Sequence, residues 1–261
     1  TGAMFVLAIS SYYLLNHKHI AFARRSFAIA ASFGLASTLS VIVLGDESGY
    51  ELGDVQKVKL AAVEAEYETH PAPAPFTVFG IPNDEKQETE YALQIPWAMG
   101  IIATRSLTEE VKGIKDLKEE NRERILSGIK AYEVLDDVRN GTATAEQRTA
   151  FDQNKDSLGY AMLLEPFTEN VSNPSDAALQ QAVDYSIPPV APLFWSFRLM
   201  VVAGFIMLAL FMCAFYYSTK HKVTKPRWLL KSALYGLPLP WIACEAGWFV
   251  AEYGRQPWSI A

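Results

Sequence analysis

Two acidic and two aromatic side chains recur at helical spacing near the end of an otherwise apolar stretch. The separations are four, three and four residues, so one helical face would present Trp241, Glu245, Trp248 and Glu252. A carboxylate inside an apolar helix is costly unless it faces the protein interior, where it can relay protons or bind a metal ion. An ion pair that only fastens two helices together is the alternative, and the spacing leaves both open.

Two arginines lie in or beside apolar stretches, where each requires an anionic partner. Arg255 follows Glu252 by three residues and can pair with its carboxylate or with another anion, because guanidinium binds carboxylates bidentately. Arg198 lies one or two turns inside a second apolar stretch. Close to it, Met200 is either a packing or lipid-facing residue or a thioether ligand.

Three apolar stretches that must position these side chains have the length of membrane spans. Phe27 to Leu44, Leu193 to Tyr216 and Trp228 to Phe249 hold 18 to 24 residues each. About 20 residues cross a hydrocarbon core of ~30 Å. A fourth stretch, Met4 to Leu15, is too short to span and is expected to be the end of a truncated helix. We therefore predict an all-α, polytopic transmembrane helical bundle.

Charge is strongly segregated along the chain. Between Asp46 and Ile187 there are 27 acidic and 13 basic residues, whereas residues 1–45 contain no acidic residue. The connections 16–25 and 218–227 are basic without any acidic side chain, so the positive-inside rule places both in the cytoplasm. The acidic segment is therefore expected outside. The predicted domains are the helices of 1–45, an outer loop of 46–191 and the helices of 192–261.

The outer loop is far longer than an ordinary connection, which favours a functional loop or an inserted domain. Apolar residues from Val111 to Leu135 recur at three- and four-residue spacing, as in amphipathic helices. Asn140-Gly141 breaks this pattern, and Pro188-Pro189 ends the loop. The first half holds a proline-rich run and an apolar FTVFGIP segment at 76–82. We predict a mostly helical extracytoplasmic loop.

The segment GWFVAEYGRQPW at 247–258 closely resembles the GWxxxExGRQPW signature of subunit I of cytochrome bd quinol oxidases. The resemblance implies that Glu252 is the carboxylate associated with the high-spin haem pair, haem b595 and haem d. It also implies that Glu252 contacts a high-spin haem iron, and that Trp248 and Arg255 lie beside it as catalytic residues.

The same resemblance implies that Met200 is an axial ligand of the iron of the low-spin haem b558, with Arg198 beside this cofactor. Methionine and histidine ligation tends to raise the potential of a haem, which suits an electron acceptor for quinol. The family's partner histidine has no counterpart here, because the histidines lie in connections or in the loop, at His17, His19, His70 and His221. We expect the chain to be a segment that lacks the N-terminal helices and the C-terminal end of the subunit.

Residues 45–66, with the later FGIP and IIATRS elements, resemble the start of the family's quinol-binding loop in its long form. Lys59 and Glu64 match the lysine and glutamate implicated in quinol binding, and Asp46 is a further candidate. Oxidation of a quinol releases two protons, so a carboxylate acceptor and a donor to the quinol oxygen are both needed. Spacing alone would indicate only a solvated surface, because Lys59 and Glu64 lie about 140° apart around a helix.

The resemblance implies a quinol oxidase of the bacterial cytoplasmic (inner) membrane that oxidises ubiquinol or menaquinol and reduces oxygen to water. The implied partners are subunit II, small accessory subunits, quinol and membrane lipid, with no nucleic acid. The missing helices imply that this segment alone does not turn over.

A membrane receptor with an outer sensor domain, or a proton-coupled transporter, would have the same topology. A receptor does not explain Glu245, Glu252 and Arg198 within the apolar stretches, or the GRQPW ending. A transporter would use the two carboxylates for proton coupling. Bound haem distinguishes the oxidase from both alternatives.

Overall fold

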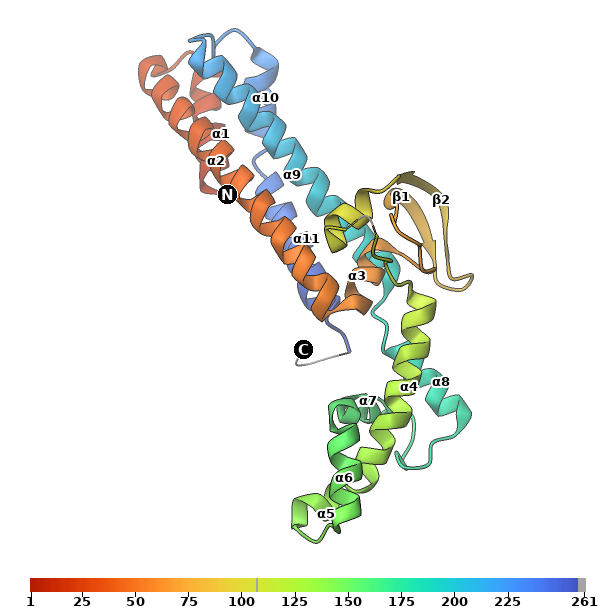
Figure 1. Ribbon diagram of the computed structural model, residues 1–261. Helices are drawn as coiled ribbons and strands as arrows, with labels where there is room; N and C mark the ends of the chain where they lie inside the picture. The colour runs from red at the N-terminus through yellow and green to blue at the C-terminus, as the bar shows by residue number, and fades with distance from the viewer. Residues whose placement is uncertain (107, 258–261) are drawn as a thin grey trace. The chain divides into compact units, whose positions relative to one another are not determined.

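The computed structural model describes residues 1–106 and 108–257, which form helices and one hairpin (Figure 1). The chain divides into two compact units. The first, here called the helical unit, comprises Thr1–Glu51 and Trp195–Glu252. The second, here called the loop unit, comprises Leu52–Phe194 and the chain from Tyr253 onward.

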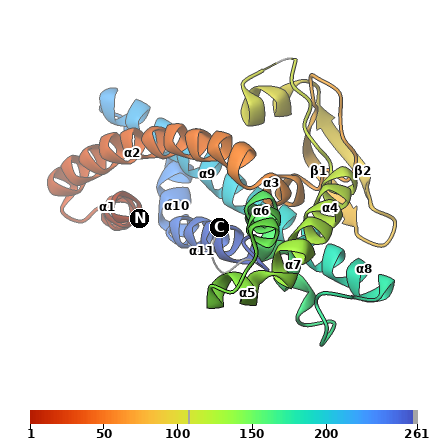
Figure 2. The same ribbon diagram turned by 60° about the horizontal axis from the view of Figure 1, so that its bottom comes forward.

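Five helices contribute to the helical unit: α1 (Gly2–Leu15), α2 (Ile20–Val55), α9 (Val190–Thr219), α10 (Arg227–Tyr235) and α11 (Leu239–Tyr253). Its buried core includes Met4 and Leu7 of α1, Phe27 of α2, and residues of α9 and α10. α2 and α9 run side by side (Figure 1, Figure 2). Gly34 permits this close approach, since a Cβ there would lie 2.2 Å from the Phe211 ring.

Two helical stretches, Ile20–Gly53 and Asp176–Thr219, are long and apolar enough to cross a membrane. Only 22 % of the most apolar 18-residue window of each is buried, unlike the core helix of a soluble protein. The exposed apolar residues include Ile29 and Phe33 on α2 and Phe205 on α9. These helices contain the predicted stretches 27–44 and 193–216. The short stretch near the N-terminus, Met4 to Leu15, lies in the helix α1.

The prediction of one continuous helix from Trp228 to Phe249 is wrong. α10 ends at Tyr235 and α11 begins at Leu239, with Gly236, Leu237 and Pro238 in turns between them. Proline lacks the backbone N–H that a helix interior needs, and its ring clashes with the preceding turn. The 15 residues of α11 extend only about 22 Å, so neither piece alone has the length of a span.

α2 continues through Asp46 to Val55, beyond the point where the sequence suggested that the outer loop begins. The division between the two compact units accordingly falls after Glu51. Glu47, Glu51 and Leu52 are good helix formers, so the change from apolar to charged residues at Asp46 does not by itself end the helix.

The loop unit is mostly helical, but the expectation of an all-α fold was too narrow. β1 (Phe76–Asn83) and β2 (Glu88–Ile95) form an antiparallel hairpin in which Phe76 pairs with Ile95. Two register shifts interrupt the pairing, one of them across Gly80. The bulges and Pro82 disturb the strict alternation that would have predicted strands from the sequence.

The remaining elements of the loop unit are α3 (Lys57–Glu64), the π-helix η1 (Gly100–Thr104), α4 (Ile114–Glu133), α5 (Leu135–Asn140), α6 (Ala145–Asn154), the 3₁₀-helix η2 (Lys155–Ser157), α7 (Leu158–Ala161), the 3₁₀-helix η3 (Met162–Leu164) and α8 (Asp176–Tyr185). The predicted amphipathic pattern is confirmed in α4, whose Ile125 and Ile129 pack with Leu164 and Leu179. The predicted break is also confirmed, since Gly141 ends α5 with φ of 76°.

Gly128 is the point at which α4 meets the chain around η2 most closely. A Cβ at this position would lie 2.2 Å from the Ser157 carbonyl oxygen and 3.0 Å from the Ala161 nitrogen. Because these contacts are to backbone, we expect Gly128→Ala to lower the free energy of unfolding of the loop unit by about 1–3 kcal/mol. Thermal unfolding of the purified protein measures the change.

The matched control for Gly128→Ala is Gly204→Ala. A Cβ at Gly204 on α9 has no neighbour within 4 Å. Alanine is the better helix former by about 1 kcal/mol, so this variant should unfold at the same temperature or higher. An unfolding temperature of Gly128→Ala equal to that of the unmodified protein would contradict the close packing described here.

Candidate functional site

The acidic and aromatic residues singled out by their spacing all lie on α11. Trp241 and Trp248 are 45 % and 64 % exposed, Glu245 is exposed, and Glu252 is partly buried. The side of α11 that carries Ala246 and Val250 is buried instead. The helix therefore has one packed side and one side that presents the two carboxylates.

Met200 approaches α11 from α9 on a different side. A Cβ at Gly247 would lie 2.9 Å from Met200 Sδ, so the glycine provides the space that the thioether occupies. At about 100° per residue, Gly247 is roughly 100° from Trp248 and 140° from Glu252 around the helix. The structure thus places Met200 and Glu252 on different sides of α11.

Arg198 is buried, with 9 % of its surface exposed, and its guanidinium carbon lies 5.5 Å from the centre of the Phe197 ring. Two residues along α9 correspond to about 200° of rotation, so Arg198 and Met200 point to nearly opposite sides. The structure does not bring these two predicted neighbours to one side of the helix.

The signature residues from Tyr253 to Pro257 lie in the loop unit. Arg255 is partly buried just after α11. Its predicted position beside the Glu252 carboxylate stays a prediction. Trp258, the last residue of the signature, lies outside the described residues.

Lys59 and Glu64 both lie on α3, which ends at Glu64. Glu64 is buried with 4 % of its surface exposed, and Lys59 is half-buried. Leu60 of the same helix packs against a small cluster formed by Ala74, Met99 and Val111. Asp46 is exposed on α2 and belongs to the helical unit.

The chain after α3 contains polar pairs that sequence reasoning missed. Ala65 has a left-handed backbone, with φ of 54°, and ends α3. Immediately afterwards, Glu66 Oε2 lies 3.1 Å from Nε2 of His70, an i,i+4 pair. The i,i+4 spacing was visible in the sequence. It did not predict a contact, because such a spacing brings side chains together in a helix and no helical pattern continues through 65–70.

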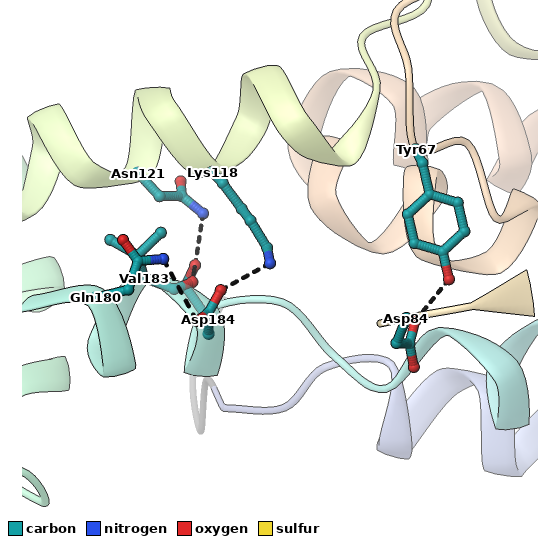
Figure 3. A network of polar contacts seen from close by, with 8 residues as sticks. Tyr67, Asp84, Lys118, Asn121, Gln180, Val183 and Asp184 are labelled. Carbon is teal, nitrogen blue, oxygen red and sulfur yellow. Dashed lines mark hydrogen bonds and ion pairs between the residues drawn. The ribbon is translucent and has the colours of Figure 1, made fainter. Parts of the chain in front are cut away.

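Tyr67 donates a hydrogen bond of 2.6 Å from its hydroxyl to the Asp84 carboxylate (Figure 3). Burial, the hydrogen bond to Asp84 and the charge of that carboxylate all raise the pKa of Tyr67, so its phenol stays protonated at physiological pH. The bond joins the segment after α3 to the hairpin turn. A second bond, from the Thr89 hydroxyl to the Ala65 carbonyl oxygen at 2.8 Å, joins the end of α3 to β2.

α4 is joined to α8 by further polar contacts (Figure 3). Lys118 Nζ lies 2.7 Å from the Asp184 carboxylate, and Asn121 donates a buried hydrogen bond of 2.8 Å to the Ser186 hydroxyl. Because the buried amide has a partner, this contact stabilises the pair of helices. The second half of the loop is therefore a packed module.

Within residues 1–106 and 108–257, no group of three or more His, Cys, Asp or Glu side chains is arranged to hold a metal ion. Haem iron needs at most two axial ligands from the protein, and single residues such as Met200 and Glu252 can supply them.

Comparison with known proteins extends over the whole sequence. The profile of the family described as cytochrome bd terminal oxidase subunit I matches residues 1–261. The chain belongs to this cytochrome bd subunit I family. The match includes the α11 signature, both long helices and the complete outer loop, so the resemblance found in a few motifs holds for the entire chain.

Two relatives in this family show how much of a subunit the chain represents. It is 44 % identical over 260 residues to cytochrome bd-II ubiquinol oxidase subunit 1 of Escherichia coli K12, covering all of this chain and 51 % of that protein. It is 27 % identical to cytochrome bd ubiquinol oxidase subunit 1 of Bacillus subtilis, covering 44 % of that protein. The chain spans about half the length of these family members.

A solved structure supports the cytochrome bd fold. The bd oxidase from Geobacillus thermodenitrificans superimposes with a TM-score of 0.62 at 24 % identity, over 98 % of this chain and 44 % of that chain. The arrangement of helices described above is therefore that of the family.

Proposed function

We propose that this chain is the central part of subunit I of a membrane-bound quinol oxidase that reduces oxygen to water. The observation that carries the proposal is the α11 signature, in which Glu252 and Trp248 lie on one side of a helix whose sequence matches the family throughout. Haem groups, when bound, would carry electrons from quinol to oxygen.

The exposed side of α11 suits a high-spin haem, because the described helices leave Trp248 uncovered beside the partly buried Glu252. Glu252 would bind the haem iron through its carboxylate. Trp248 would lie against the macrocycle, and Arg255 would neutralise an anionic group next to it. Haem b595 and haem d are the two high-spin haems that we assign to this side of the helix.

We assign the low-spin haem b558 to the Met200 side of α11. Met200 would supply a thioether ligand, and its Sδ lies in the space that the absent side chain of Gly247 leaves. Arg198 would serve a haem propionate from another side of α9, about 200° around the helix from Met200, because guanidinium binds carboxylates bidentately. His17, His19 and His221 lie in the connections next to α1, α2 and α9, so we expect the second axial ligand from another part of the subunit.

Quinol would bind at α3, with Lys59 holding a quinol oxygen and Glu64 accepting a proton. Burial suits Glu64 to this role, because a carboxylate removed from water takes up a proton more readily. Asp46, which belongs to the helical unit, is a further candidate residue for quinol binding. The loop unit would then face the outside of the bacterial cytoplasmic membrane, and subunit II, small accessory subunits and membrane lipid would be the partners.

A reduced-minus-oxidised absorption spectrum of the complete subunit, purified in detergent, tests the proposal. Bands of a low-spin b haem and of a chlorin-type d haem are the expected result. A receptor or a proton-coupled transporter would bind no haem, so a spectrum without haem bands would favour one of those classes.

Met200→Leu tests the low-spin site in the complete subunit. Leucine has nearly the same volume but no sulfur, so the haem should lose one axial ligand and change from low to high spin. The α-band of the reduced low-spin haem should disappear while the high-spin bands remain. Met207→Leu, a methionine of the same helix that packs in the core, is the control. A normal low-spin band in Met200→Leu would refute the ligand role.

A further inference from the structure

We propose that Glu66 and His70 form a proton-exit pair that carries a proton from the quinol site on α3 to the surrounding water. The inference rests on the proposed quinol oxidation, and it adds two proton-transfer residues to it. Both residues lie in the loop unit, on the segment that follows Glu64.

The backbone around Glu66 is held on both sides. Its N–H donates to the Ala61 carbonyl oxygen at 2.9 Å, and its own carbonyl accepts from Ile114 N–H at 2.8 Å. These bonds place Glu66 just after the end of α3, two residues along the chain from Glu64, with 5 % of its side chain exposed. Glu66 is therefore a second buried carboxylate on the segment that follows the predicted proton acceptor.

His70 connects this buried carboxylate to solvent. Its Nε2 lies 3.1 Å from Glu66 Oε2, whereas 34 % of its side chain is exposed. Backbone hydrogen bonds of 3.3 and 3.4 Å with Val111 hold the residue in place. The pair thus has one partner away from water and one in contact with water, within hydrogen-bonding distance of each other.

The other charged groups around His70 are engaged in contacts of their own. They are Glu68, which pairs with Lys115 at 2.9 Å, Asp116, which accepts from Thr69, and Lys112, which pairs with Glu120. The hydrogen bond and charge of Lys115 lower the pKa of Glu68, so this carboxylate stays ionised at neutral pH. Imidazole is the side chain that ordinarily changes charge within about pH 5 to 8.

A quinol gives up two electrons, which would leave through the haem sites, and two protons. In the proposed route each proton passes in turn to the Glu64 carboxylate and then to Glu66, whose Oε2 delivers it to Nε2 of neutral His70. The imidazolium releases the first proton to water and is neutral again before the second arrives, so both protons of the quinol leave by the same route.

A purely structural role is the competing explanation, because the same pair would also fasten the chain after α3. The two roles differ in their pH dependence. A neutral imidazole accepts a proton and a charged one does not, so quinol turnover that uses His70 should fall on acidification. A purely structural contact between Glu66 and His70 would not determine how the rate depends on pH.

The experiment is His70→Gln in the complete, assembled oxidase. We expect the acid limb of the quinol pH–rate profile to disappear and the rate at neutral pH to fall about tenfold, less than for a fully enclosed acid–base residue because water can partly replace an exposed imidazole. Haem spectra should be unchanged. Oxygen uptake driven by tetramethyl-p-phenylenediamine, which delivers electrons without a quinol, should also be unchanged.

His221→Gln, an exposed histidine outside this site, is the control and should retain the original profile. Glu66→Gln keeps a polar partner for His70 but cannot carry the proton, so it should also lose quinol turnover selectively. An unaltered profile shape in either variant would overturn the proposal. Glu64→Ala distinguishes a failure of the proposed quinol site from a failure of the proton-exit pair. If this variant keeps its quinol turnover, the assignment of the quinol site is wrong, whatever the result for His70→Gln.

Discussion

Glu64→Ala in the complete oxidase is expected to reduce quinol-driven oxygen uptake by about 100-fold or more, since a positioned proton acceptor contributes roughly 10²–10⁴-fold to such a step. Glu64 is buried at the end of α3, with 4 % of its surface exposed. The measurement is oxygen consumption with quinol, together with a haem spectrum of the same preparation.

The haem bands distinguish a quinol role from a general loss of structure in Glu64→Ala. They should be intact, because Glu64 lies in the loop unit and we assign all haem contacts elsewhere. Glu85→Ala, which removes an exposed carboxylate from the hairpin turn, is the matched control and should turn over normally. Loss of a haem band in Glu64→Ala would remove this residue from the quinol site.

Glu252→Gln is expected to abolish one high-spin haem band and to lower oxygen reduction by at least about 100-fold. Substitution of residues that hydrogen-bond to the ligands of a metal typically costs 10- to 100-fold in metal affinity or activity. Removal of a ligand itself should cost at least as much. Glutamine preserves the size of the side chain and its packing on α11. The absorption spectrum of the reduced protein measures haem content, and oxygen uptake with an artificial electron donor measures catalysis.

Glu245→Gln is the matched variant for this second experiment, since it removes a carboxylate from the same side of the same helix. We assign the ligand role to Glu252 alone, so Glu245→Gln should retain the high-spin bands. The low-spin band should persist in both variants, because Met200 contacts α11 on another side. A complete set of bands in Glu252→Gln would eliminate its role as a haem ligand.

The candidate residues differ in how far the sequence alone could identify them. The grouping on α11 followed from residue spacing, because helical geometry is local and repeats every 3.6 residues. Lys59 and Glu64 emerged only from the family resemblance, since on α3 their spacing puts them about 140° apart. The positions of Glu66 and His70 depend on backbone hydrogen bonds with the distant residues Val111 and Ile114.

Some errors have equally specific causes. The helix predicted over 228–249 is interrupted at 236–238. The prediction missed this break because it relied on the length of the apolar stretch, which does not register one proline and its missing N–H. The hairpin at 76–95 was missed because its bulges disturb the alternation of a regular strand.

The sequence by itself determined which segments are apolar and long, where the charge lies, and which side chains share the exposed side of α11. These properties depend on composition and on local helical geometry. Only the tertiary structure decided that Met200 packs on Gly247 away from Glu252, that Glu64 is buried, and that His70 reaches Glu66 beside a strand-like contact with Val111. Such contacts join residues far apart in the chain, and their energies depend on close packing that no local pattern encodes.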